Sequence, residues 1–175
     1  ISKIYDDSYK MISIPGGNHF PEVTTEINDD VKKGTLLLNY TGHGGESGWS
    51  FEQALTTSDI ESWTNFDKLP VFVTATCEFS RFDNPERYTA GEMVILHPDG
   101  GAIALFSTTR LAFAGLNILL NTSLFEHLMD KLPAGGYVTT GDLIRLSKND
   151  NSNHAQLRNF VLLGDPAQRI AFTGY

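Results

Sequence analysis

The sequence contains a single cysteine, Cys77, among its 175 residues. One cysteine cannot form an internal disulfide, and no Cys/His pairs have the spacing of a structural zinc site. Basic residues are also scarce, since 13 Lys and Arg stand against 21 Asp and Glu and give a formal net charge of -8. A nucleic-acid-binding surface normally needs clustered Lys and Arg, so we expect no nucleic-acid partner.

Long apolar runs are absent as well. The longest candidate, residues 111–120, is interrupted by Gly115 and Asn117, so we expect no transmembrane segment. The first ten residues carry Asp6 and Asp7 and no apolar stretch, so we expect that they are not a signal peptide. The chain starts with isoleucine rather than methionine, and we expect it to be cut from a longer polypeptide.

Hydrophobic residues make up 41% of the chain, which is enough to bury one core of ordinary domain size. Short apolar runs typical of buried strands alternate with amphipathic segments typical of helices. We expect strands at 2–5, 35–40, 70–76, 101–107 and 168–172, and helices at 21–33, 57–63, 89–96, 116–132 and 140–147. This alternation predicts an α/β fold with a parallel sheet covered by helices on both faces.

The second expected helix carries its own start signal. Either Thr57 or Ser58 can cap it, and Glu61 stands three residues after Ser58 as a capping box requires. We therefore expect this helix to begin at one of these two residues.

Two reactive side chains follow two of the expected strands. His43 comes three residues after the run 35–40, and Cys77 comes directly after the run 70–76. Parallel sheets bind ligands beyond the carboxyl ends of their strands. If these strands are neighbours, about 4.8 Å apart, the imidazole and the thiol reach the same rim and can act as base and nucleophile. Gly44, Gly45 and Cys77 would then supply uncovered N–H groups to hold a developing oxyanion.

Other interpretations of these residues stay open on chemistry alone. A lone cysteine is often a small buried hydrophobe, and a histidine between glycines is often a turn residue. The segment "GHGGESG" lacks the lysine of a phosphate-binding P-loop. His43 and Glu46 have no evident third ligand, so we expect no metal and no cofactor. We expect the remaining histidines to be structural or solvated: His19, His97, His127 and His154.

Four separated motifs occur in a fixed order along the chain: "NYTGHGGESGW", "VFVTATCEFSRFD", "GGAIALFSTTR" and "NFVLLGDPAQRI". Together they resemble the gingipain-type cysteine peptidase family, and within it the type IX secretion sortases, which are C-terminal signal peptidases. The resemblance covers nearly the whole chain. It implies a caspase-like α/β fold with a mostly parallel sheet flanked by helices, in which residues 1–175 are the C-terminal portion of an incomplete catalytic domain.

The same resemblance assigns roles to individual residues. It implies that His43 and Cys77 are the catalytic dyad and that the N–H groups of Gly44 and Cys77 form the oxyanion hole. It also implies a substrate-binding set consisting of Glu46, Ser107, Thr108 and Thr109, the last three bordering the cleft after the third strand. In this family a carboxylate orients the histidine, and we expect it upstream of residue 1. We locate no acidic specificity pocket of the kind that Arg- or Lys-specific gingipains carry.

The function implied by the resemblance is cleavage of protein substrates. A sortase of this kind would remove the C-terminal signal domain of exported proteins, with transpeptidation to an amine as a further step. Its partners would be secretion-system components, and its location the cell surface, the outer membrane or the extracellular space. The alternatives are a gingipain-type secreted endopeptidase and a non-catalytic caspase-like module of a secretion assembly.

Overall fold

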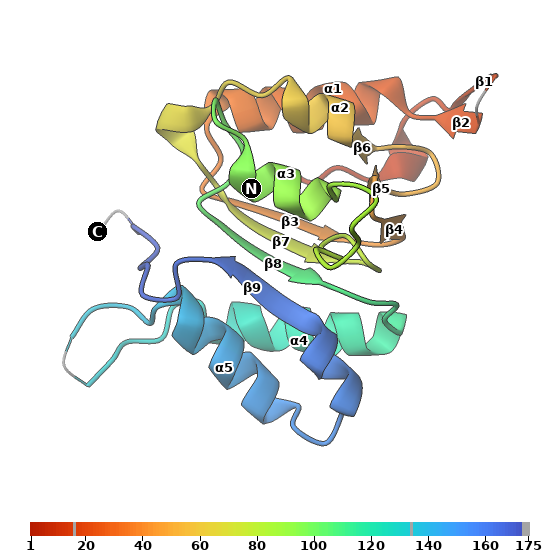
Figure 1. Ribbon diagram of the computed structural model, residues 1–175. Coiled ribbons are helices and arrows are strands. Elements are labelled where there is room, and N and C mark those ends of the chain that lie inside the picture. The colour runs from red at the N-terminus through yellow and green to blue at the C-terminus, as the bar shows by residue number, and fades with distance from the viewer. Residues whose placement is uncertain (16, 134, 173–175) are drawn as a thin grey trace.

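A four-stranded sheet forms the centre of the computed structural model, which describes residues 1–15, 17–133 and 135–172 (Figure 1). The strand order is β3-β7-β8-β9. Strands β3 (Leu37–Thr41), β7 (Val71–Ala75) and β8 (Ala104–Thr108) are parallel, and β9 (Phe160–Gly164) is antiparallel to β8. The predicted α/β class with a mostly parallel sheet is confirmed.

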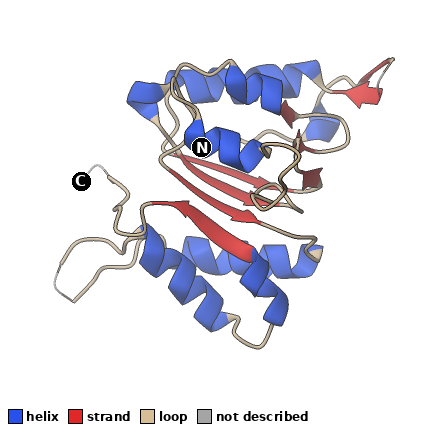
Figure 2. Ribbon diagram, viewed as in Figure 1, coloured by secondary structure: helices blue, strands red, loops and turns tan. Residues whose placement is uncertain are grey.

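Helices cover both faces of this sheet, as Figure 2 shows. On one face lie α1 (Pro21–Lys33), α2 (Thr57–Glu61) and α3 (Ala90–Leu96), and on the other lie α4 (Ala114–His127) and α5 (Thr140–Asp150). Each face has its own buried cluster, because strand side chains alternate between the two faces. In β7, Phe72 packs into the cluster beneath α1 to α3, and Val71 and Val73 pack into the cluster against α4 and α5.

Three helices begin with a capping box in which a threonine is the cap. The pairs are Thr56 with Asp59 at α2, Thr89 with Glu92 at α3, and Thr139 with Asp142 at α5. The expectation that Thr57 or Ser58 caps α2 with Glu61 is therefore wrong. Asp59 takes the third position instead, because its carboxylate accepts hydrogen bonds from both the N–H and the hydroxyl of Thr56.

A small antiparallel sheet lies beyond the carboxyl end of β3 (Figure 1). It consists of β4 (Gly44–Gly45), β5 (Gly48–Trp49) and β6 (Leu55–Thr56). A separate hairpin pairs β1 (Ile12–Ile14) with β2 (Gly17–His19). Short 3-10 helices occur at Asp6–Ser8, Phe66–Lys68 and Ala155–Asn159.

Three expected elements differ in the structure. Residues 2–5 form no strand, and the helix expected at 116–132 ends at His127. Residues 168–172 make only an isolated bridge, Thr139 to Arg169, while β9 at Phe160–Gly164 closes the sheet. No helix in the described part of the chain has the length and hydrophobicity needed to cross a membrane.

Candidate active site

The register of β3 and β7 brings the two reactive residues to the same edge of the sheet. The last paired residues are Thr41 and Ala75, so His43 and Cys77 each stand two residues beyond the pair. Gly42 N–H donates to the Ala75 carbonyl at 3.4 Å, which continues the pairing past the strand ends. The strands are thus direct neighbours, as the sequence argument required.

Gly44 lies in close contact with the residue that precedes the cysteine. A methyl group added at Gly44 would come within 3.0 Å of both the Thr76 Cβ and the Gly48 carbonyl oxygen. A side chain at this position would push these neighbours apart by a few tenths of an ångström, and glycine avoids that shift. The glycine after His43 therefore allows the histidine hairpin and the cysteine strand to lie against each other.

Cys77 occupies a sharp turn at the end of β7. Its side chain is partly buried, and the thiol donates a weak hydrogen bond to the Ala112 carbonyl at 3.5 Å. The next residue, Glu78, has a φ of 52°, a left-handed conformation that few residues other than glycine adopt. Non-glycine residues in such conformations cluster at functional sites. The left-handed conformation of Glu78 was not expected from the sequence.

His43 is exposed, and its surroundings hold its backbone more firmly than its ring. The His43 carbonyl accepts from the Tyr40 hydroxyl at 2.9 Å and from Ser50 N–H at 2.8 Å. The ring packs against Phe51 with 5.3 Å between centroids. No residue of the described chain forms a hydrogen bond with the imidazole nitrogens, so no orienting carboxylate is found among these residues.

An aromatic stack links this histidine segment to the core. The Tyr40 ring stacks on Trp49 with centroids 4.3 Å apart, and the Trp49 indole N–H donates to Thr74 Oγ1 of β7 at 2.9 Å. Burial is the main cause that raises the pKa of Tyr40, so its hydroxyl stays protonated and can donate to His43. The backbone of His43 is thereby connected to a fully buried part of the sheet.

Among the described residues, the backbone amides of Gly44 and Cys77 make no hydrogen bond to the neighbouring strands. His43 and Ser50 form a hydrogen-bonded pair of the small sheet, so the next pair, Gly44 and Trp49, is a non-hydrogen-bonded one. The N–H of Gly44 therefore points away from β5. Within the described residues, the N–H of Cys77 has no acceptor either.

Glu46 connects the histidine hairpin to the loop that follows Cys77. Its carboxylate accepts from Arg81 at 3.1 Å and from Asn84 at 2.8 Å, and Arg87 Nε lies 3.7 Å away. Arg81 also reaches Glu78 at 3.4 Å. The Glu46 side chain is only 15% exposed because these partners surround it. Its predicted role in substrate binding stays a prediction, and the sequence did not indicate these contacts.

The expected substrate-bordering segment 107–109 lies deeper than anticipated. Ser107 and Thr108 are the last residues of β8 rather than part of a following loop, and they are 0% and 1% exposed. Thr109 is partly exposed, and its hydroxyl donates to the Asn159 carbonyl at 3.2 Å. In this structure only Thr109 of the three has a side chain at the surface.

An ion pair joins the loop after β7 to the loop after β8. Arg110 donates through both terminal nitrogens to the Asp83 carboxylate, at 2.9 and 2.5 Å. This hydrogen bonding lowers the pKa of Asp83. Glu78 N–H also donates to the Arg110 carbonyl at 3.3 Å, so the loop after β8 stays close to the cysteine turn.

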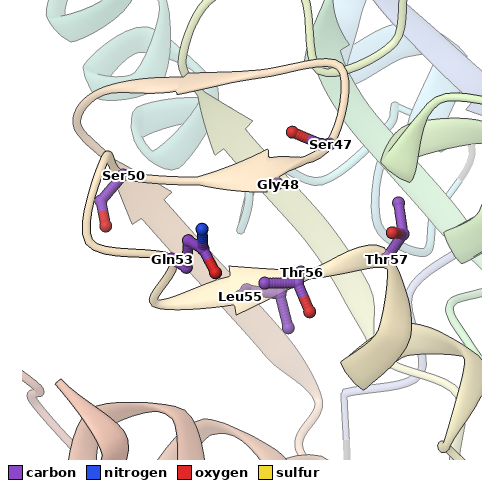
Figure 3. Close-up of a pocket in the computed structure, with 7 residues that line it drawn as sticks. All are labelled: Ser47, Gly48, Ser50, Gln53, Leu55, Thr56 and Thr57. Carbon is purple, nitrogen blue, oxygen red and sulfur yellow. The ribbon is translucent and has the colours of Figure 1, made fainter. Parts of the chain in front are cut away.

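A polar pocket of about 220 Å³ lies on the small sheet (Figure 3). Neither His43 nor Cys77 lines it. The lining consists of uncharged residues: Ser47, Gly48, Ser50, Gln53, Leu55, Thr56 and Thr57. We therefore place the candidate active site at the strand ends and not in this pocket. The structure shows no cluster of three metal-ligating side chains in the residues it describes.

Known proteins are similar to this chain in sequence. Gingipain R2 of Porphyromonas gingivalis is 26% identical over 157 residues, which are 84% of this chain and 21% of that protein. Lys-gingipain W83 of the same species is 27% identical over 111 residues, covering 63% of this chain and 6% of that protein. This chain thus spans about a fifth or less of the length of these relatives.

The fold is also found in solved structures. The crystal structure of the Arg-specific cysteine proteinase gingipain R superposes with a TM-score of 0.70 at 22% identity, over 84% of this chain and 36% of that one. A complex of gingipain pro- and mature domains from Porphyromonas gingivalis gives a TM-score of 0.69 at 21% identity, over 84% of this chain and 37% of that one. The model of Peptidase family C25 matches residues 1–171, and the chain belongs to this family of gingipain-type cysteine peptidases.

Proposed function

We propose that this chain carries the Cys–His reaction centre of a cysteine endopeptidase. The observation that carries the proposal is the register of β3 and β7, which sets His43 and Cys77 two residues beyond the same strand pair. The family membership of the chain supports it. In this proposal Cys77 is the nucleophile and His43 is the base.

The reaction begins with transfer of the thiol proton from Cys77 to the imidazole of His43. The sulfur then forms a bond to the peptide carbonyl carbon, and the carbonyl electron pair moves to oxygen. Collapse of this intermediate breaks the C–N bond, and His43 returns the proton to the leaving amine. An acyl-enzyme on Cys77 remains, and water hydrolyses it in the second half of the reaction.

The negative charge on oxygen is held by the N–H groups of Gly44 and Cys77. The Cys77 amide has no acceptor within the described chain, and the Gly44 amide points away from β5. Donors fixed in advance stabilise the intermediate without reorganisation, which is why such groups contribute strongly to rate.

The remaining site residues are proposed to serve the substrate. Glu46 anchors the loop 78–89 that follows Cys77, and Thr109 is the partly exposed residue directly after β8. We further propose that residues 1–175 are the C-terminal portion of a larger caspase-like domain, since the chain covers 36% of the gingipain R structure. A gingipain-type enzyme of this kind acts outside the cell or at its surface.

A narrower version is a type IX secretion sortase at the outer membrane, working with other secretion-system components. The four motifs beginning with "NYTGHGGESGW" favour this version. Such an enzyme removes the C-terminal signal domain of an exported protein and passes the acyl group to an amine. Hydrolysis and transfer share the acyl-enzyme on Cys77, so the two versions differ only in what resolves it.

A peptide library incubated with the full-length protein tests the proposal. We expect cleavage that Cys77→Ala and His43→Ala each abolish while the thermal unfolding midpoint is unchanged. Added glycine amide separates the two versions, because a transferase yields products carrying the amide and an endopeptidase yields free carboxylates. Cleavage that persists in both variants would overturn the proposal, and no cleavage in any protein would favour the non-catalytic module.

A further inference from the structure

Two buried side chains hold the carbonyl group that directly precedes Cys77. Thr108 Oγ1 donates to the Thr76 carbonyl oxygen at 2.8 Å, and Asn117 Nδ2 donates to the same oxygen at 3.0 Å. Thr108 is 1% exposed and Asn117 is 5% exposed. They come from β8 and α4, far from Thr76 in the sequence. Both lone pairs of this carbonyl are therefore used by donors fixed in the core.

The position of these donors sets the direction of the Cys77 N–H. The peptide between Thr76 and Cys77 is trans, so its N–H points opposite to its C=O. Thr108 belongs to β8, on one side of β7, and β3 lies on the other side. The Cys77 N–H is therefore directed to the side of β3, where the histidine hairpin begins. Successive carbonyls of a strand point to opposite sides, and the carbonyl of Ala75 accordingly faces β3, since it accepts from Gly42 N–H.

We propose that Thr108 and Asn117 are positioning residues that fix the Cys77 N–H as an oxyanion donor. This inference rests on the proposed function. Two hydrogen bonds to the carbonyl lock the plane of the peptide and polarise it, which strengthens its N–H as a donor. The arrangement gives Thr108 and Asn117 an effect on the reaction although neither touches the substrate.

Two reactions of Cys77 separate this role from a merely structural one. With p-nitrophenyl acetate the sulfur attacks a carbonyl, an oxyanion forms, p-nitrophenolate leaves and an acetyl-enzyme remains. With iodoacetamide the sulfur displaces iodide from a saturated carbon, and no oxyanion forms. Both probes are small, so neither depends on the peptide specificity. A donor that is correctly placed accelerates only the first reaction.

The experiment compares both rate constants in variants of the full-length protein. Thr108→Val removes the hydroxyl at nearly constant shape, and Thr108→Ser restores a hydroxyl at the same position. Ser147→Ala is the matched control, because the Ser147 hydroxyl is also buried and donates to a backbone carbonyl at 2.7 Å, but within α5. Asn117→Ala removes the second donor to the Thr76 carbonyl.

We expect Thr108→Val to slow acetylation about tenfold, less than the roughly 100- to 1,000-fold loss of a whole oxyanion donor. Alkylation by iodoacetamide stays near the wild-type rate, and Asn117→Ala gives the same selective loss. Thr108→Ser recovers acetylation, and Ser147→Ala changes neither reaction.

Equal slowing of both reactions by Thr108→Val, or slowing of neither, would overturn the inference. The proposed function is checked separately in the same assay. If His43→Ala leaves both wild-type rates unchanged, the dyad itself is refuted; if His43→Ala slows both while Thr108→Val is inert, only the positioning role is refuted.

Discussion

Cys77 follows an inner strand of the sheet, whereas His43 follows the strand at its edge. Strand β7 lies between β3 and β8, and buried donors fix the peptide before the cysteine. His43 is exposed, and its ring contacts the exposed Phe51. The proposed nucleophile is thus placed by the core, while the hydrogen bonds that place the proposed base all go to its backbone. Substitutions in the core should therefore disturb the cysteine end, and surface substitutions the histidine end.

The largest effect on stability is expected at Trp49, which connects the histidine segment to the core. Trp49→Ala removes the ring that stacks on Tyr40 and bonds Thr74, and it leaves a cavity in the core. We expect a loss of about 3–5 kcal/mol in the free energy of unfolding, measured by urea denaturation. Phe51→Ala is the control from the same hairpin, because this ring is 80% exposed. It should change stability by no more than about 0.5 kcal/mol, and an equal loss in both variants would contradict the comparison.

A smaller effect on stability is expected at Glu46, which connects the histidine hairpin to the loop after Cys77. Glu46→Gln replaces one carboxylate oxygen by a donor, which then faces Arg81 or Asn84. We expect a loss of about 1 kcal/mol in the free energy of unfolding and faster proteolysis of the loop 78–89. Asp30→Asn, at the exposed pair with Lys33, serves as the reference and should be nearly silent. If the loop is as resistant in Glu46→Gln as in wild type, Glu46 does not anchor it.

The smallest effect concerns a histidine that is fully paired. His127 lies between Asp130, at 2.6 Å, and Asp150, at 2.7 Å. These two hydrogen bonds raise the pKa of His127 in the folded protein, and the bond to Asp130 has the larger effect. The stabilisation is therefore complete below the unfolded pKa of about 6.5 and is lost as the pH rises through the raised folded value.

Replacement of this histidine should show that pH dependence. We expect His127→Gln to lower the thermal midpoint at pH 5.5 and to have little effect at pH 9. The stability lost at pH 5.5 should be below about 1 kcal/mol, because the site is partly exposed and water screens the charges. His43→Gln provides the comparison, since no described carboxylate pairs with that ring. A larger loss at pH 9 than at pH 5.5 would show that the charged form of His127 is not the stabilising one.

Much of the fold was accessible from the sequence because its signals are local. The apolar runs at β3, β7 and β8 are each contained within a few residues. The sequence predicts the last strand at 168–172. Only its pairing with β8 selects Phe160–Gly164, and pairing depends on residues far apart in the chain.

The difference between local signals and long-range contacts also applies to the candidate site. His43 and Cys77 were identified from their positions after two strands. The partners of Glu46 and the donors to the Thr76 carbonyl were not identified from the sequence, because each contact joins residues more than thirty positions apart. The family resemblance implies a place for Thr108 at the substrate cleft, whereas the structure shows its side chain buried in the sheet.

The most direct test of the account is the rate of Cys77 alkylation by iodoacetamide at pH 7 in wild-type and His43→Ala protein. A free thiol is only a few per cent thiolate at this pH, so a base within reach should raise the rate. The account predicts that wild-type protein reacts at least about tenfold faster than a free thiol and that His43→Ala loses this advantage. Equal rates in the two proteins would contradict the claim that imidazole and thiol act together.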